Sequence, residues 1–140
     1  MSEARVLIAE DETLIRLDVR RLLEAGGFEV CAEARNGPEA VTLAREHEPD
    51  VVVLDVRMPG LDGVEAARRI LAERHVPIVM LTAYGYGELI SRALDTGVAG
   101  YVVKPFTERE LLGAVRAAVE EAPGAEALAY LHRPIPPTAP

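Results

Sequence analysis

Short apolar runs alternate with longer segments of helical periodicity through most of this chain, and this alternation constrains its fold more than any other feature. The apolar runs have the length and β-branched content of buried strands, and the segments between them carry apolar residues three and four positions apart. Five such units predict an α/β fold, an open, doubly wound, five-stranded parallel sheet with helices on both faces. The predicted strands are Arg5–Ala9, Phe28–Ala34, Val51–Leu54, Pro77–Leu81 and Gly100–Val103, and the predicted helices are Glu12–Ala25, Pro38–His47, Val64–Arg74, Tyr86–Asp95 and Thr107–Glu120.

Turn and cap residues indicate one domain followed by a tail. Gly26-Gly27 is expected to end the first helix, and Asp62 is placed to cap the third. Thr107 and Glu110 have the spacing of a capping box at the start of the last helix. These signals predict a single domain over residues 1–121. Residues 122–140 form a short, proline-rich tail that is too small to build a second core.

Polar residues follow three of the predicted strands at the point where each ends. Glu10-Asp11-Glu12 follows the first strand, Asp55 the third, and Lys104-Pro105 the fifth. The carboxyl ends of strands in an open parallel sheet gather at one crevice, which predicts a pocket of carboxylates with one ammonium. Such a pocket suits Mg²⁺, and the lysine can hold a transferred phosphoryl group. Asp55 is therefore a candidate phosphoryl acceptor.

The charge and the cysteine content exclude several classes of function. The net charge of -8 argues against direct binding of DNA or RNA, because phosphate neutralisation dominates nucleic-acid affinity. The single cysteine, Cys31, excludes an intramolecular disulfide and is expected to be a buried, inert thiol. No signal peptide is visible, and no apolar run reaches the ~18 residues of a membrane span. We therefore expect a cytoplasmic protein that does not contact the membrane.

Four fragments together resemble the receiver domain of two-component response regulators, over about Ala4 to Glu121. Any one of them is weak evidence, but all four occur in order, each at a strand end. The resemblance implies a flavodoxin-like sheet with strand order 2-1-3-4-5. The fragments are Val6-Leu7-Ile8-Ala9-Glu10-Asp11-Glu12, Val53-Leu54-Asp55-Val56-Arg57-Met58-Pro59-Gly60-Leu61-Asp62-Gly63, Pro77-Ile78-Val79-Met80-Leu81-Thr82-Ala83 and Gly100-Tyr101-Val102-Val103-Lys104-Pro105-Phe106.

The resemblance also implies a role for each site residue. Asp55 would accept a phosphoryl group from a sensor histidine kinase or a phosphotransfer protein, and a cis peptide between Lys104 and Pro105 would aim the ammonium into the pocket. Mg²⁺ would be held by Glu10, Asp11, Asp55 and the backbone carbonyl of Arg57. The phosphoryl oxygens would be bound by the Thr82 hydroxyl, the Ala83 N–H and Lys104.

In the resembled family, a threonine and an aromatic residue transmit the signal, and here they are Thr82 and Tyr101. The segments Tyr86–Asp95, Gly100–Val103 and Thr107–Glu120 would form the face that binds a downstream protein or a second copy of the chain. Ion pairs among Arg92, Asp95, Arg109 and Glu110 could join two such copies.

The sequence departs from many receivers at Glu10, where those have aspartate, and metal binding should persist because the carboxylate remains. Arg57 and Tyr84 lie where bulky residues are expected to slow hydrolysis of the phosphoryl group.

Three other functions compete with the phosphoacceptor, and the first is an RNA-binding antiterminator acting through the tail, which the net charge of -8 disfavours. Ile8–Glu12 and Leu14-Ile15-Arg16 look most like receivers attached to RNA-binding antiterminator modules. The chain would then be a single-domain receiver or the remnant of a regulator that lost its output domain. The second alternative is a phosphorylation-independent scaffold, against which the intact Asp11, Asp55, Thr82 and Lys104 argue. The last alternative is an enzyme, a Mg²⁺-dependent phosphatase. Such an enzyme usually needs a second carboxylate as acid or base two residues after its nucleophile, and this chain has Arg57 at that position.

Overall fold

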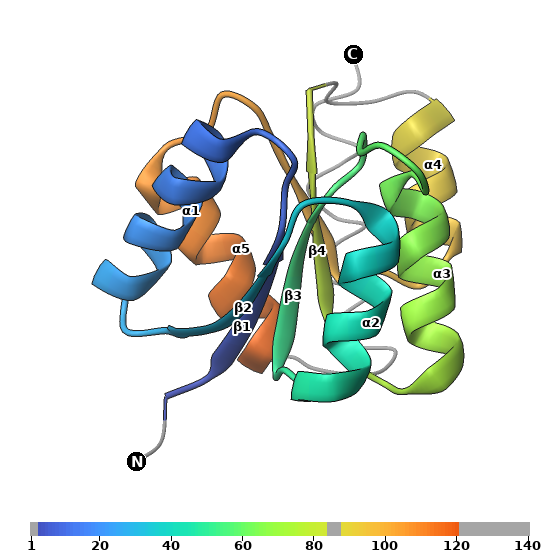
Figure 1. Cartoon of the computed structure of the whole chain (residues 1–140). Coiled ribbons are helices and arrows are strands. Elements are labelled where there is room, and N and C mark those ends of the chain that lie inside the picture. Colours follow the sequence, from blue (N-terminus) through green and yellow to red (C-terminus); the bar gives the residue numbers. More distant parts are fainter. Residues whose placement is uncertain (1–2, 84–87, 121–140) are drawn as a thin grey trace.

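The computed structural model describes residues 3–83 and 88–120, which form a five-stranded parallel sheet with helices on both sides (Figure 1). The strand order is β2-β1-β3-β4-β5, as the resemblance implied. The strands are β1 (Arg5–Ala9), β2 (Glu29–Ala34), β3 (Val51–Asp55), β4 (Ile78–Thr82) and β5 (Gly100–Val103), and the helices are α1 (Thr13–Ala25), α2 (Gly37–His47), α3 (Gly63–Glu73), α4 (Glu88–Asp95) and α5 (Glu108–Glu120).

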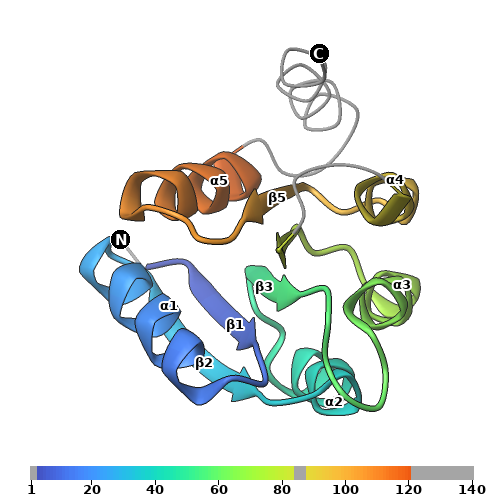
Figure 2. The same cartoon turned by 90° about the horizontal axis from the view of Figure 1, so that it is seen from above.

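The helices divide between the two faces of the sheet. Helices α1 and α5 lie on one face, and α2, α3 and α4 lie on the other, as the view from above shows (Figure 2). Strands β3 and β4 are buried along their whole length, which explains their continuous apolar sequences. Because successive side chains of a strand point to opposite faces of the sheet, they pack into two separate cores.

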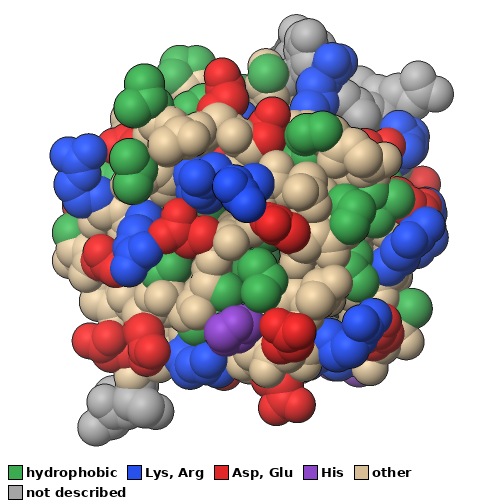
Figure 3. All heavy atoms as spheres, in the orientation of Figure 1, with side chains coloured by type: hydrophobic (Ala, Val, Ile, Leu, Met, Phe, Trp, Pro, Cys, Tyr) green, Lys and Arg blue, Asp and Glu red, His purple; other side chains and the backbone are tan. Residues whose placement is uncertain are grey.

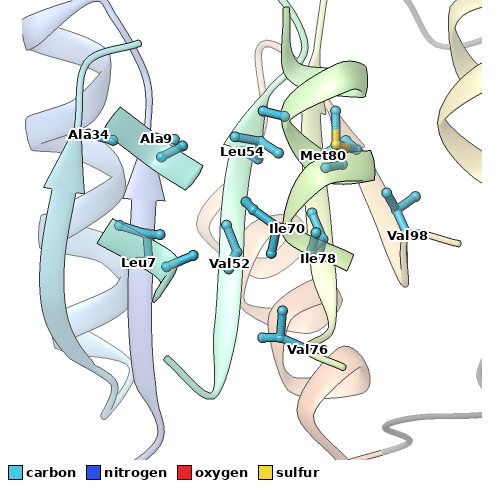
Figure 4. Close-up of a cluster of buried hydrophobic side chains, with 14 of the residues drawn as sticks. Leu7, Ala9, Ala34, Val52, Leu54, Ile70, Val76, Ile78, Met80 and Val98 are labelled. Carbon is cyan, nitrogen blue, oxygen red and sulfur yellow. The ribbon is translucent and has the colours of Figure 1, made fainter. Parts of the chain in front are cut away.

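One core fills the space between the sheet and helices α2 and α3 (Figure 4). Its strand members include Leu7, Val52, Leu54, Ile78 and Met80, which alternate with residues of the second core. The second core lies under α1 and α5 and is lined by Val6, Ile8, Val19, Leu23, Val53, Leu81, Val102, Leu111 and Val115, among others.

The local signals for helix ends are confirmed. Asp62 Oδ1 accepts a hydrogen bond from the Glu65 N–H at 2.8 Å and so caps α3. Thr107 and Glu110 form the reciprocal pair of a capping box, with bonds of 2.9 and 3.1 Å. Within the described residues, each predicted element end either coincides with the observed one or differs from it by one residue. Helix α4 is described from Glu88, so the predicted start at Tyr86 lies outside the described residues, as does the predicted tail at 122–140.

Candidate functional site

Three charged side chains converge at the carboxyl edge of the sheet, from β1, β3 and β5. Glu10, Asp55 and Lys104 each stand two residues beyond a member of the core under α1 and α5, namely Ile8, Val53 and Val102, so the strand period directs them to the same face. Lys104 Nζ lies 3.0 Å from Glu10 Oε1 and 3.2 Å from Asp55 Oδ2. The predicted convergence of these strand ends is confirmed.

The site is shielded from water to different degrees at its three charged groups. The side chain of Glu10 is 0% exposed, that of Asp55 8% and that of Lys104 18%. Burial raises the pKa of Glu10 from 4.5 to about 7, although hydrogen bonds from the Glu12 N–H and from Lys104 oppose the rise. Burial also opposes the charge of Lys104, but its hydrogen bond to Glu10 and the neighbouring carboxylates outweigh burial and raise its pKa.

Three carboxylates in this pocket form a donor set that fits a divalent cation. Glu10, Asp11 and Asp55 each offer an oxygen, and these oxygens lie within 4.8 Å of one another. Carboxylate oxygens are the ligands that Mg²⁺ prefers, and Lys104 alone cannot neutralise three negative charges. Asp55 Oδ1 also accepts a hydrogen bond from the Arg57 N–H at 3.3 Å, which brings the Arg57 backbone to the pocket. Coordination by the Arg57 carbonyl stays a prediction.

The backbone beside Asp55 is held by close contacts on two sides. The N–H of Val56 donates to the Leu81 carbonyl at 2.9 Å, and the N–H of Gly63 donates to the Val56 carbonyl at 2.7 Å. A Cβ at Gly63 would lie 2.0 Å from the Asp55 carbonyl oxygen, so only glycine lets α3 begin this close to the strand. The Asp55 side chain therefore starts from a rigid position.

Thr82 and Tyr101 lie on the opposite face of the sheet from the charged cluster. Met80 pairs with Tyr101 in the register of β4 and β5, so Thr82, two residues after Met80, shares the face of Tyr101. Thr82 is buried, and Tyr101 is half-buried against the core under α2 and α3. The Thr82 carbonyl accepts a hydrogen bond from the Lys104 N–H at 2.7 Å, which links the two strand ends.

The predicted cis peptide between Lys104 and Pro105 is present. Ala83 directly follows β4 and is exposed. The roles assigned to Thr82, Ala83 and Tyr101 in binding the phosphoryl group and in switching stay predictions.

Two features of the site were missed in the sequence. Arg16 donates hydrogen bonds to the Glu10 carbonyl at 2.8 Å and to the Glu33 carboxylate on β2 at 3.1 Å. No local sequence pattern predicts these contacts. Lys104 is also the only lysine in the chain, since the other 14 of its 15 basic residues are arginines. A compact ammonium and a planar guanidinium bind oxygen differently. The occurrence of the chain's one lysine at this position could therefore have identified it as a site residue from the sequence.

Several surface residues lie apart from the site. Cys31 is only half-buried, in contrast to the expected buried thiol; its Sγ donates to the Val6 carbonyl at 3.5 Å, and burial raises its pKa. Arg92 lies 3.9 Å from Asp62 of the same chain, and the Glu110 carboxylate serves the capping box. An ion pair between copies would therefore compete with existing partners of both residues. Tyr84 lies outside the described residues.

The surface carries both signs of charge without a basic patch on the face drawn in Figure 3. Acidic and basic side chains are interspersed over α1, β2 and α2, where Arg20 pairs with Glu24 and Glu33 (Figure 3). No helix within residues 3–83 and 88–120 combines the length and apolar character needed to cross a membrane.

Comparison with known proteins agrees with this architecture. The family model of the response regulator receiver domain matches residues 6–116. The transcriptional regulatory protein PdtaR of Mycobacterium tuberculosis is 50% identical over 115 residues, which are 82% of this chain but only 56% of PdtaR. The chemotaxis protein CheY of Bacillus subtilis is 37% identical over 112 residues, which are 79% of this chain and 93% of CheY.

Solved receiver domains share the fold. The receiver domain of NarL from Mycobacterium tuberculosis superposes with a TM-score of 0.83 at 32% identity, covering 87% of this chain and 100% of that one. The response regulator domain of CheB from Thermotoga maritima gives 0.81 at 27% identity, with the same coverage. The chain belongs to the response regulator receiver family.

Proposed function

We propose that this protein is a phosphoacceptor signalling domain in which Asp55 receives a phosphoryl group from a phosphohistidine on a sensor histidine kinase or phosphotransfer protein. The observation that carries the proposal is the position of Asp55 Oδ2, 3.2 Å from the chain's only lysine and beside two further carboxylates. This arrangement can stabilise charge on a transferred phosphoryl group, because phosphoryl transfer depends mainly on positioning and electrostatics.

The transfer requires few steps from the protein. A carboxylate oxygen of Asp55 attacks phosphorus while the P–N bond to the donor imidazole breaks, and the electron pair of that bond stays on the imidazole nitrogen. Glu10, Asp11 and Asp55 would hold Mg²⁺, which supplies charge neutralisation for the phosphoryl oxygens. Lys104 exchanges its contact with Asp55 Oδ2 for a phosphoryl oxygen and keeps a compensating charge in the pocket.

The signal would leave the site across the sheet. The Thr82 hydroxyl and the Ala83 N–H bind phosphoryl oxygens, and movement of Thr82 opens space on the face that it shares with Tyr101. Tyr101 then rotates and changes the surface formed by α4, β5 and α5, which a downstream protein or a second copy recognises. This sequence of events makes the domain a switch with no enzymatic output of its own.

Apolar groups on α1 offer a place for the phosphodonor protein beside the site. Leu14 and Leu17 are 81% and 48% exposed, although large apolar side chains are usually buried. On the same helix, Ile15 and Asp18 line a hollow of about 390 Å³ together with Lys104, Pro105 and Phe106. A donor bound there would bring its phosphohistidine to the carboxyl edge of the sheet, and we expect this encounter in the cytoplasm, where such kinases present their donor domains.

The proposal is tested by incubating the protein with a small acyl phosphate and Mg²⁺ and measuring its intact mass. We expect one added phosphoryl group on the wild type, its absence without Mg²⁺, and its absence from Asp55→Asn. Asp62→Asn is the matched control, because Asp62 caps α3 through its side-chain oxygen and asparagine caps equally well. An adduct that persists in Asp55→Asn would refute the assignment, and a folded protein with neither adduct nor Mg²⁺ binding would favour a phosphorylation-independent scaffold.

A second candidate is the receiver portion of a transcriptional regulator of the antiterminator type. The 50% identity to the transcriptional regulatory protein PdtaR, of which the chain spans 56%, favours a transcriptional regulator, and the resemblance at residues 8–16 suggests the antiterminator type. The negative charge of the chain and its mixed surface disfavour direct contact with RNA. Filter binding of this chain to structured RNA, with and without the phosphodonor, tests direct contact: retained RNA would favour the antiterminator candidate, and none would leave a receiver that acts through protein partners.

A further inference from the structure

Arg16 on α1 connects the loop after β1 to the edge strand of the sheet. Its Nη1 donates a hydrogen bond to the Glu10 carbonyl at 2.8 Å, and its Nε donates to Glu33 Oε1 at 3.1 Å. Only 12% of the Arg16 side chain is exposed, so both contacts are largely shielded from water. A planar guanidinium presents its donors in a rigid fork, and the bond to Glu33 therefore orients the bond to Glu10.

These contacts hold the backbone of Glu10 from both sides. Its N–H donates to the Ala34 carbonyl on β2 at 3.0 Å, and its carbonyl accepts from Arg16. The peptide group between Glu10 and Asp11 is thus oriented by the guanidinium. Because this peptide group sets where the Asp11 side chain begins, its rotation would move the Asp11 carboxylate away from Asp55.

We propose that Arg16 is a positioning residue for the divalent-cation site, acting through the Glu10 carbonyl without touching the ion or the phosphoryl group. This inference rests on the proposed function, because it assumes that Glu10, Asp11 and Asp55 bind Mg²⁺. It adds to that function a residue of α1 that is anchored to β2 through Glu33 and reaches the site through the Glu10 carbonyl.

Charge and positioning predict opposite effects when Arg16 is replaced. Removing a positive charge near an acidic pocket should tighten binding of a cation. Losing a hydrogen bond that orients the ligands should weaken it, and loss of such outer partners typically costs roughly 10-fold to 100-fold in metal affinity. Since Glu33 already pairs with the Arg16 charge, the weakening should dominate. The sign of the change therefore separates the two mechanisms.

The test is a calorimetric titration of Mg²⁺ into metal-free wild type, Arg16→Met and Arg20→Met at one ionic strength. Arg20 is the matched control, because it also lies on α1 and pairs with Glu33, and it contacts Glu24 at 3.0 Å instead of the Glu10 carbonyl. We expect Arg16→Met to bind Mg²⁺ at least about tenfold more weakly, and Arg20→Met to stay close to the wild type. The ¹⁵N shift of the Asp11 amide, which senses hydrogen bonding at the Glu10 carbonyl, should move only in Arg16→Met.

Each outcome decides the proposal. Mg²⁺ binding that is unchanged or tighter in Arg16→Met overturns it, while Asp55 phosphorylation in the wild type would leave the proposed function intact. A wild type that binds no Mg²⁺ overturns both. If circular dichroism shows that Arg16→Met does not fold, Arg16→Lys replaces it. One lysine nitrogen cannot reproduce the fork between Glu33 and the Glu10 carbonyl, so wild-type affinity in Arg16→Lys would also overturn the inference.

Discussion

Glu10→Gln is expected to remove a pH-dependent loss of stability that the metal-free wild type carries. Glu10 is fully buried, and burial raises its pKa from 4.5 to about 7. For each pH unit between these two pKa values, the free energy of unfolding falls by about 1.36 kcal/mol, so the total loss reaches about 3 kcal/mol.

The sign follows from where the proton sits. Below about pH 4.5 Glu10 is protonated in both the folded and the unfolded chain, and the group costs nothing. As the pH rises toward about 7, the unfolded chain releases the proton while the folded chain keeps it, so stability is lost progressively. Above that pH the loss is complete and constant. Glutamine has no proton to release and should show none of this change.

Urea unfolding in the presence of a chelator measures the effect. The free energy of unfolding of Glu10→Gln minus that of the wild type should increase by about 3 kcal/mol between about pH 4.5 and about pH 8. Other titrating groups are common to both proteins and cancel in this difference. Saturating Mg²⁺ should restore the wild type at the higher pH, because the cation favours the carboxylate. A difference that does not vary with pH, or that decreases as the pH rises, would refute the reasoning.

Substitutions at four further positions test other parts of the structure. Without Mg²⁺, Lys104→Met should lower the free energy of unfolding by about 3 kcal/mol at about pH 8. The loss should be smaller at about pH 5, because Glu10 is protonated at that pH and leaves less unpaired charge. Equal losses at both pH values in urea titrations would contradict this. Gly63→Ala should cost at least about 2 kcal/mol, because its Cβ would lie 2.0 Å from the Asp55 carbonyl oxygen. Gly113→Ala, at an exposed position of α5 where a Cβ has nothing within 4 Å, should stabilise by up to about 1 kcal/mol; thermal unfolding that ranks the two the other way would show the contact to be wrong. Thr107→Ala should cost about 1 kcal/mol in the same assay, since it removes the oxygen that caps α5, and Thr107→Ser should restore most of it.

Local features of the sequence were sufficient for most of the fold. The five strand–helix units and the caps at Asp62 and Thr107 depend on contacts within a few residues, which is why the sequence predicted them. The positions of Tyr86 and the tail at 122–140 were not tested, because they lie outside the described residues.

The membership of the site was also predictable. A parallel sheet brings its carboxyl strand ends to one edge, so the placement of Glu10, Asp55 and Lys104 after three strands was enough to expect that they meet. What could not be expected was how they share their contacts. Lys104 donates hydrogen bonds to both carboxylates. How it divides its contacts between them depends on the distances to Asp55 and Glu10, which are 49 and 94 residues away in the chain.

The sequence by itself determined the order of the elements, the faces that they bury and the set of charged residues at the edge of the sheet, because side-chain period and cap chemistry are local. Only the tertiary structure decided that Glu10 is buried deeply enough to hold a proton near neutral pH and that Arg16 spans from Glu33 to the Glu10 carbonyl. Burial and the approach of distant side chains are properties of the packed chain, since solvent exclusion arises from all the elements around a site at once.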